Sequence, residues 1–169
     1  MNQPSLAVLS GNRFIDLKPG DLDEAEQDTL VELAIAILRE RNRPGKTLRT
    51  PLQVKDYIRL RLAERHHETF GAIFLDTRHR ILSDEEMFHG TFDGTSVHPR
   101  VVAQRALTLN AAAVVFYHNH PSGVAEPSMA DQKITDKLRE ALSLIEVRVL
   151  DHIVVGHEDA CSLAERGLL

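Results

Sequence analysis

Two histidines and an aspartate in the second half of the chain have the types and spacing of a metal-binding group. His118 and His120 are separated by a single residue, and Asp131 follows after a short loop. Side chains two positions apart on a strand point to the same side, so we expect both imidazoles to face one way. Two imidazoles and a carboxylate give three ligands and leave a fourth position for water, which is typical of catalytic rather than structural zinc sites.

A strand, a loop and a helix are predicted to bring these three side chains together. The apolar run 111–117 is short and partly β-branched or aromatic, which indicates a buried strand leading to the histidines. Pro121 and Gly123 end this strand, and Ser128 has the position of the N-cap of a helix whose first turn contains Asp131. Two simpler explanations stay open: Ser128 and Asp131 also form a capping box, and a histidine at a strand end is usually a hydrogen-bonded surface residue.

Composition excludes several classes of protein. The 169 residues suffice for one well-buried core with an extension, and the single cysteine, Cys161, permits neither an internal disulfide nor a zinc site with several thiolates. The chain therefore lacks the paired cysteines of the zinc deaminases. No apolar run is long enough to span a bilayer, and the N-terminus lacks the pattern of a signal peptide, so we expect a cytoplasmic protein without a membrane anchor.

Basic residues are concentrated in one part of the chain. The net charge of -5 does not indicate a protein held on nucleic acid by its overall charge. Several bases nevertheless lie between Arg39 and Arg65, which makes DNA a candidate partner, although a solvated helix face is the more usual explanation. The bases are Arg39, Arg41, Arg43, Lys46, Arg49, Lys55, Arg59, Arg61 and Arg65.

The sequence ahead of the metal-binding pattern divides the chain into two parts. Residues 1–46 are predicted to form a loose arm and an amphipathic helix that is capped near Asp23 and packs on the rest of the protein or pairs with a second copy. Residues 47–169 are predicted to form the main domain, which begins with a helix from Pro51 to about His66.

The main domain is predicted to be of the α/β class, with a mixed sheet and helices on its faces. A helix is expected to begin at His98-Pro99, and one of the later strands is expected to be interrupted at Asp151 and His152. His152 could reach the site and orient a metal ligand, but we favour its interpretation as a hydrogen-bonded core histidine. The expected strands cover 68–76, 111–117, 147–155 and 160–163, and residues 81–82 with 87–88 are expected to supply one or two more.

The spacing of the candidate ligands resembles a known motif. His118-x-His120, followed by Ser128 and Asp131, is similar to the JAMM motif of the MPN+ (JAB1/MPN/Mov34) metallopeptidases, and residues 118–131 more closely resemble the bacterial RadC family. The resemblance implies the three-layer α/β/α, cytidine deaminase-like fold of the MPN domain. It also implies the short RadC-like form, without the helix-hairpin-helix module of longer RadC proteins. Further similarity covers 74–77, 97–100 and 151–156.

The resemblance also assigns a general base. Glu68 begins an ETFG sequence that is similar to the Glu-Thr-x-Gly found at a strand start in MPN+ peptidases. The resemblance implies that Glu68 takes a proton from the attacking water and returns it to the leaving amine. It also implies that Ser128 donates a hydrogen bond to the water or the oxyanion. A solvated strand-end acid and a simple N-cap are the alternatives. Glu85 and Glu86 are interpreted as turn or edge residues.

The implied function is that of a zinc-dependent hydrolase of the JAMM type, a metallopeptidase or isopeptidase acting on a peptide or protein. One Zn²⁺ per chain is expected at His118, His120 and Asp131, although such ligands also accept Mn²⁺ or Ni²⁺. The alternative is a DNA-repair-associated RadC-like protein that binds or acts on DNA, with the metal site in a nuclease or structural role. A non-catalytic MPN module would lack the ligands that this chain retains.

Overall fold

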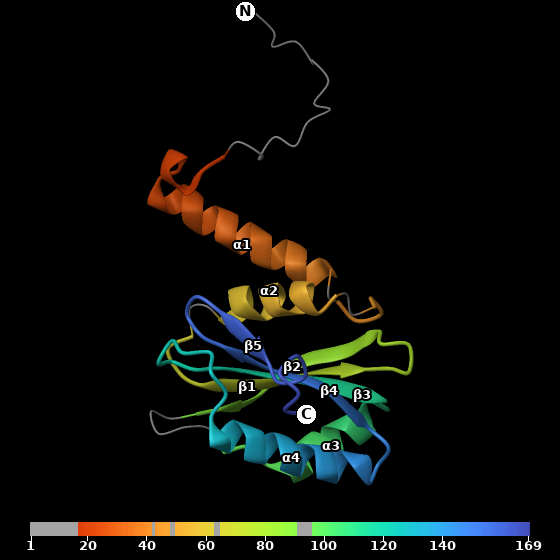
Figure 1. Cartoon of the computed structure of the whole chain (residues 1–169). Helices are drawn as coiled ribbons and strands as arrows, with labels where there is room; N and C mark the ends of the chain where they lie inside the picture. Colours follow the sequence, from red (N-terminus) through yellow and green to blue (C-terminus); the bar gives the residue numbers. More distant parts are fainter. Residues whose placement is uncertain (1–16, 42, 48–49, 63–64, 91–95) are drawn as a thin grey trace, which may run out of the picture.

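A mixed five-stranded sheet forms the centre of the protein (Figure 1). The computed structural model describes residues 17–41, 43–47, 50–62, 65–90 and 96–169, with the side chains of Arg39 and Arg41 not described. The strand order is β2-β1-β3-β4-β5; β3 pairs antiparallel with β1 and parallel with β4. The strands are β1 (Thr69–Leu75), β2 (Ile81–His89), β3 (Ala113–Asn119), β4 (Arg148–Val155) and β5 (Ala160–Ser162).

Helices cover both faces of this sheet, which confirms the predicted three-layer α/β/α architecture (Figure 1). One face is covered by α2 (Pro51–Leu62), and the other by α3 (Pro99–Thr108) and α4 (Met129–Ser143). Outside α2 lies α1 (Glu24–Arg41), which is preceded by the 3-10 turn η1 (Pro19–Asp21). None of the helices in the described ranges is both long and apolar enough to cross a membrane.

The central strand β3 separates two apolar cores because its side chains alternate between the two faces. Val115 and Tyr117 belong to the core beneath α2, whereas Phe116 belongs to the core beneath α3 and α4. All residues of β3 are buried. His118 continues the series of Phe116 and therefore lies on the α4 face of the sheet.

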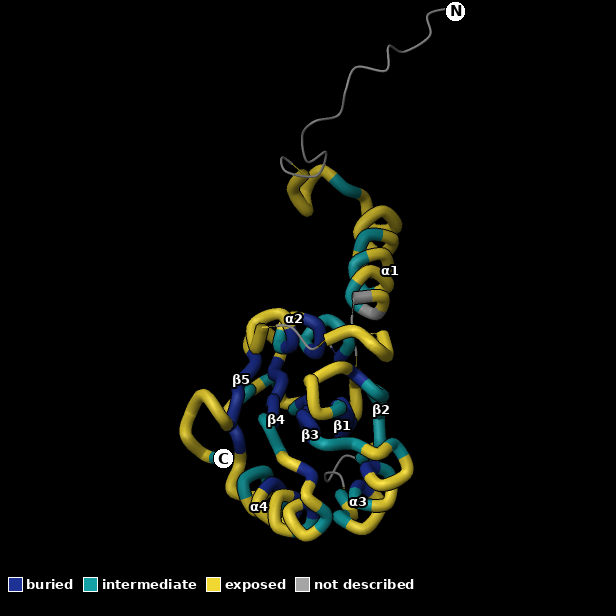
Figure 2. The backbone as a smooth tube through the Cα atoms, turned by 90° about the vertical axis from the view of Figure 1, so that its right-hand side faces the viewer, coloured by how far each residue is buried: buried dark blue, intermediate teal, exposed yellow. Residues whose placement is uncertain are grey.

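The amphipathic N-terminal helix docks through only part of its apolar stripe. Its predicted cap is present, since Asp23 and Glu26 exchange backbone and side-chain hydrogen bonds at 2.9–3.0 Å. Leu38 packs against the core beneath α2, but Leu33 and Ile37 remain 49% and 44% exposed. Figure 2 shows that most of α1 is exposed. Residues 1–16 of the expected arm lie outside the part of the chain that the structure describes.

Three details of the predicted elements were wrong. The central strand was expected over 111–117 but spans Ala113–Asn119. The helix from Pro51 ends at Leu62 rather than near His66. The strand β4 runs without interruption through Asp151 and His152, because the two polar side chains point to opposite faces and each is hydrogen-bonded there.

Gly71 in β1 leaves room for a side chain from the neighbouring strand. A Cβ atom built at Gly71 would overlap the ring of Tyr117, its cross-strand partner in β3. The Tyr117 hydroxyl donates a 2.8 Å hydrogen bond to Asp84 on β2, so the ring crosses over β1 at this position. Asp84 also accepts a 2.6 Å hydrogen bond from Tyr57 on α2 and forms an ion pair with Arg61. Gly71 thus permits a polar connection between the sheet and α2.

We expect Gly71→Ala to lower the free energy of unfolding by about 1–3 kcal/mol, the usual cost of overpacking a core. Without a clash, alanine is more favourable than glycine inside a strand. A loss of stability in Gly71→Ala would therefore be due to the clash with Tyr117. Urea denaturation followed by circular dichroism measures the change. Gly20→Ala, where nothing lies within 4 Å of the added Cβ, is the matched control and should change little. Equal stability of the two variants would contradict the packing argument.

Candidate metal centre

The structure brings His118, His120 and Asp131 together at the end of β3. The Nε2 atom of His118 lies 3.1 Å from Asp131 Oδ1, and Nε2 of His120 lies 3.3 Å from Asp131 Oδ2. The two Nε2 atoms are 2.9 Å apart. One possible ligand atom from each of the three residues lies within 4.8 Å of the other two, so the three side chains could share one metal ion. His118 is buried and the other two are partly buried.

The loop between β3 and α4 is held in place by backbone hydrogen bonds to the end of β4. The His120 amide donates to Val155 O at 2.8 Å, and the His157 amide donates to Gly123 O at 3.0 Å. Gly123 adopts a positive φ of 85°, a conformation that favours glycine. A side chain at Gly156 would overlap the carbonyl of Gly123, so this glycine permits the close approach.

One hydrogen bond in the loop selects the nitrogen of His120 that faces the cluster. Nδ1 of His120 lies 2.8 Å from the carbonyl oxygen of Val124. A carbonyl can only accept, so Nδ1 carries the hydrogen and donates it. In neutral His120 the Nε2 atom therefore holds a lone pair, which is what a metal ligand requires.

Asp131 is held by the helix cap as well as by the histidines. Its Oδ2 atom accepts hydrogen bonds from the amide and the hydroxyl of Ser128, both at 2.6 Å, and its own amide donates to Ser128 Oγ at 3.1 Å. The capping box and the metal-binding interpretation are therefore compatible. Ser128 gives its hydroxyl hydrogen to Asp131, and its predicted contact with water or an oxyanion stays a prediction.

Glu68 lies immediately before β1, beside the histidines. Phe70 pairs with His118, and continuing this antiparallel register places Glu68 opposite His120, on the same face of the sheet. The negative charge of Glu68 is among the causes that raise the pKa of His120. Glu85 and Glu86 lie on the edge strand β2 and are held there by Arg105 and by Arg61 and Arg65, respectively. The position of Glu68 agrees with its predicted role, which stays a prediction.

Asn119, between the two histidines, fixes the backbone on both sides of Glu68. Its Oδ1 atom accepts a 2.8 Å hydrogen bond from the amide of Thr69, and its Nδ2 atom donates to His67 O at 3.1 Å. Asn119 is only 4% exposed. The alternation of side chains along β3 predicted that Asn119 points away from the histidines, but no pattern in the sequence indicated these backbone partners.

His152 is a buried, hydrogen-bonded histidine, as favoured, and it also contacts a candidate ligand, which was the alternative. Its Nε2 atom lies 2.9 Å from Nδ1 of His118, and its Nδ1 atom lies 2.6 Å from the hydroxyl of Thr135. The sequence offered no signal for Thr135 other than its place one helical turn after Asp131. His152 is completely buried, and this burial is the main reason that its pKa lies well below the usual range.

The charges of the cluster shift two pKa values in opposite directions. Hydrogen bonding to Asp131 is the largest cause that raises the pKa of His120. Burial would raise the pKa of Asp131, but hydrogen bonds from His118 and His120 outweigh it and hold this pKa well below its usual range. Asp131 is therefore a carboxylate at neutral pH, as a ligand must be.

We expect the affinity for zinc to rise with pH by up to about tenfold per unit while His120 loses its proton. A metal ion competes with the proton on His120, and the raised pKa extends this competition above the ordinary histidine value of 6.5. Competition against a fluorescent chelator of known pH dependence measures the affinity. In Glu68→Gln the zinc affinity should stop rising at a lower pH, because the charge of Glu68 is one cause of the raised pKa of His120. An affinity independent of pH between 6 and 8 would contradict this assignment.

The residues fit a zinc ion in their chemistry. Two imidazole nitrogens and one carboxylate oxygen are ligands that zinc accepts, and three protein ligands leave a position for a reactant. The same donors accept other divalent ions, so the donor set fits a metal site but does not identify the metal.

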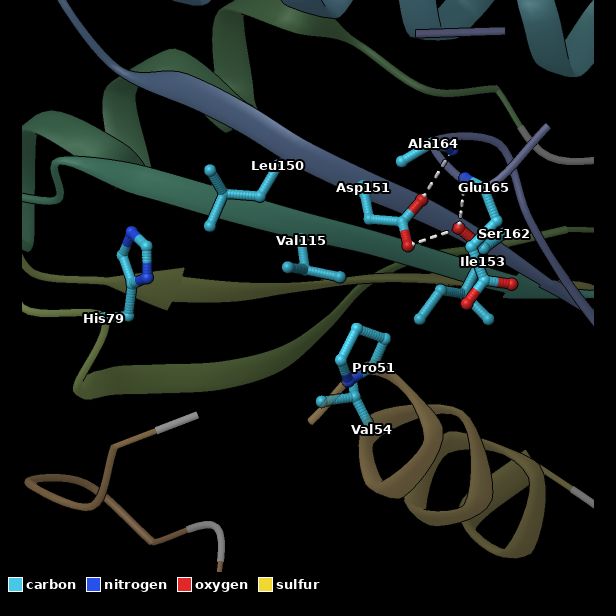
Figure 3. Close-up of a pocket in the computed structure, with 10 residues that line it drawn as sticks. All are labelled: Pro51, Val54, His79, Val115, Leu150, Asp151, Ile153, Ser162, Ala164 and Glu165. Carbon is cyan, nitrogen blue, oxygen red and sulfur yellow. Dashed lines mark hydrogen bonds between the residues drawn. The ribbon is translucent and has the colours of Figure 1, made fainter. Parts of the chain in front are cut away.

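A hollow of about 250 Å³ lies on the face of the sheet opposite the candidate metal centre (Figure 3). Val54 from α2, Val115 from β3 and Leu150 from β4 form part of its apolar lining. Asp151 at one end is already engaged by the Ser162 hydroxyl at 2.6 Å and the Ala164 amide at 3.1 Å. Val115 and His118 lie on opposite sides of β3, so this hollow is not an approach to the metal centre.

Several bases of the 39–65 stretch are paired with groups of the protein itself. Lys55 lies 2.7 Å from Glu165, Arg65 lies 3.0 Å from Glu86, and Arg61 pairs with Asp84. Arg59 donates to the carbonyl oxygen of Glu158. These contacts leave fewer cations for phosphate groups. Arg49 and the side chains of Arg39 and Arg41 lie outside what the structure describes.

The fold and the cluster define an α/β domain of the JAB/MPN type, with two histidines and an aspartate beside the central strand. Residues 48–168 match the family model of the RadC-like JAB domain, and the chain belongs to this family.

Its relatives carry the name UPF0758 protein. One from Marinobacter nauticus is 47% identical over 165 residues, covering 97% of this chain and 74% of the relative. One from Stutzerimonas stutzeri is 52% identical over 143 residues, covering 85% of this chain and 64% of the relative. One from Halorhodospira halophila is 49% identical over 150 residues, covering 89% of this chain and 67% of the relative. The matched region is thus 64 to 74% of the length of these relatives, and their name states no activity.

Proposed function

We propose that the protein is a metal-dependent hydrolase that cuts amide or isopeptide bonds in a peptide or protein, with zinc as its metal. The observation that carries the proposal is the convergence of His118, His120 and Asp131 within 4.8 Å, beside Glu68. When bound there, a divalent ion lowers the pKa of water toward about 7 and polarises a carbonyl group. Membership in the RadC-like JAB domain family supports this class of chemistry.

The chain itself supplies the proton transfer and the positioning. Glu68 is our candidate for the group that accepts a proton from the attacking water and delivers it to the leaving amine. The Asn119 amide holds the backbone around Glu68, so the carboxylate starts from a fixed position near His120. Ser128 orients Asp131 through two hydrogen bonds. If the Ser128 hydroxyl donated its hydrogen bond to an oxyanion instead of to Asp131, it would lower the activation free energy by about 3 kcal/mol.

We expect chelation to abolish the hydrolysis and added zinc to restore it. The assay incubates the purified protein with a proteome-derived peptide and protein mixture and identifies new termini and released modifiers by mass spectrometry. Cleavage that persists after the metal has been removed would contradict the proposed function. Cleavage restored by Mn²⁺ or Ni²⁺ but not by Zn²⁺ would retain the hydrolase and replace the proposed metal.

A further inference from the structure

We propose that Thr135 and His152 set the tautomer of His118, so that its Nε2 atom offers a lone pair to a metal ion. The inference rests on the proposed metal site and adds two positioning residues, one from α4 and one from β4. Three short contacts connect the helix backbone to the candidate ligand: Thr135 to Asp131 O at 2.5 Å, Thr135 to His152 at 2.6 Å, and His152 to His118 at 2.9 Å.

The direction of each hydrogen bond follows from counting donors. The Thr135 hydroxyl has one hydrogen, and the carbonyl oxygen of Asp131 can only accept it. The same hydroxyl must therefore accept from Nδ1 of His152, which carries a hydrogen. Thr135 thus fixes which nitrogen of His152 is protonated.

The protonation of His152 in turn determines which nitrogen of His118 carries the hydrogen. His152 is 0% exposed, and its two ring nitrogens lie 2.6 Å from the Thr135 hydroxyl and 2.9 Å from Nδ1 of His118. Burying a cation here is costly, and neither of these two partners is a carboxylate, so the ring is neutral and its Nε2 atom accepts. The donor to this atom is Nδ1 of His118. In neutral His118 the hydrogen therefore sits on Nδ1, and Nε2 faces Asp131 and His120 with a lone pair.

The packing around the pair keeps the rings from turning. Phe70 stacks on His118 at a centroid distance of 6.2 Å and meets His152 edge-on at 5.4 Å. Phe116 meets His152 edge-on at 6.0 Å. With the rings enclosed by two phenylalanines, the tautomers are controlled by the hydrogen bonds at their ends. Without the Thr135 hydroxyl, His152 is free to place its hydrogen on Nε2 and to force the hydrogen of His118 onto the ligand nitrogen.

The test compares zinc affinities of three threonine variants. We expect Thr135→Val, which has a similar shape but lacks the hydroxyl, to bind zinc about 10–100-fold more weakly, the usual effect of losing an orienting partner. Thr135→Ser keeps a hydroxyl and should bind nearly as tightly as the wild type. Thr108→Val is the matched control, since Thr108 makes the same bond to the carbonyl four residues earlier, at 2.8 Å on α3, without a histidine partner.

Nuclear magnetic resonance separates this role from a merely structural one. Long-range proton–nitrogen correlations of ¹⁵N-histidine in the zinc-bound wild type should show hydrogens on Nδ1 of both His152 and His118. A hydrogen on Nε2 of His152, or equal zinc affinity in Thr135→Val and Thr135→Ser, would overturn the inference while leaving the metal site intact. Absence of zinc binding by the wild type would instead overturn the proposed function, and the inference with it.

Discussion

Replacing Glu68 with glutamine is expected to lower the rate of hydrolysis by about 10²–10⁴-fold while leaving the zinc content unchanged. Glutamine is close in size to glutamate, but it cannot accept a proton at neutral pH. Glu68 is not among the three residues that could share the ion, so its substitution removes no ligand. The rate is measured on substrates that the proteomic comparison identifies, and zinc is measured by atomic emission on the same samples.

Glu86→Gln is the matched control for this substitution. Glu86 pairs with Gly71 in the sheet, as Tyr117 does, so its side chain lies on the face opposite the histidines. It is held there by Arg61 and Arg65, and its substitution should leave the rate of hydrolysis unchanged. If Glu68→Gln were as active as the wild type, Glu68 would be a structural residue and the proton transfer would belong to another group.

Replacing Asp131 with asparagine is expected to reduce bound zinc from one ion per chain to almost none. Asparagine keeps the shape and can still accept the hydrogen bonds of the cap from Ser128, but it lacks the negative charge with which a carboxylate binds a zinc ion. The helix should therefore remain folded while the site loses its only anionic ligand. Gel filtration followed by atomic emission gives the stoichiometry, and circular dichroism verifies the fold. His118→Ala should lose zinc as well.

Asp136→Asn tests whether the loss of zinc is specific to Asp131. Asp136 lies on the same helix α4, is exposed, and pairs with Arg139 at 2.9 Å. It should retain a full complement of zinc, since it contacts none of the candidate ligands. Full metal content in both Asp131→Asn and His118→Ala would contradict the ligand assignment, because each substitution removes a donor from the cluster.

The sequence was sufficient to predict the architecture because its patterns are local and strong. The apolar run before His118 gave the central strand, and Ser128 with Asp131 gave the start of α4. Spacing, together with the resemblance to the JAMM motif, also predicted that the three candidate ligands meet, since they belong to one strand, one loop and one helix turn. The strand through Asp151 and His152 was expected to break, because a polar pair in an apolar run resembles a turn until its partners are known.

The supporting contacts could not be predicted because they join residues that are distant in the chain. Asn119 contacts the backbone on either side of Glu68 across the sheet, and His152 reaches His118 from the neighbouring strand. Such contacts depend on strand order and register, which a single sequence does not define. Thr135 illustrates the same limit: a threonine in a helix has no distinguishing feature until its neighbour on β4 is in place.

The attachment of the loop to the end of β4 has a consequence for the candidate metal site. The bonds from His120 to Val155 and from His157 to Gly123 involve only the chain, as does the cap at Ser128. A zinc finger, in contrast, needs its metal in order to fold. Because these bonds join only groups of the chain, we expect the loop and the start of α4 to keep their backbone conformation when a chelator removes divalent metal ions. Hydrogen exchange of the His120 and His157 amides with and without chelator measures this.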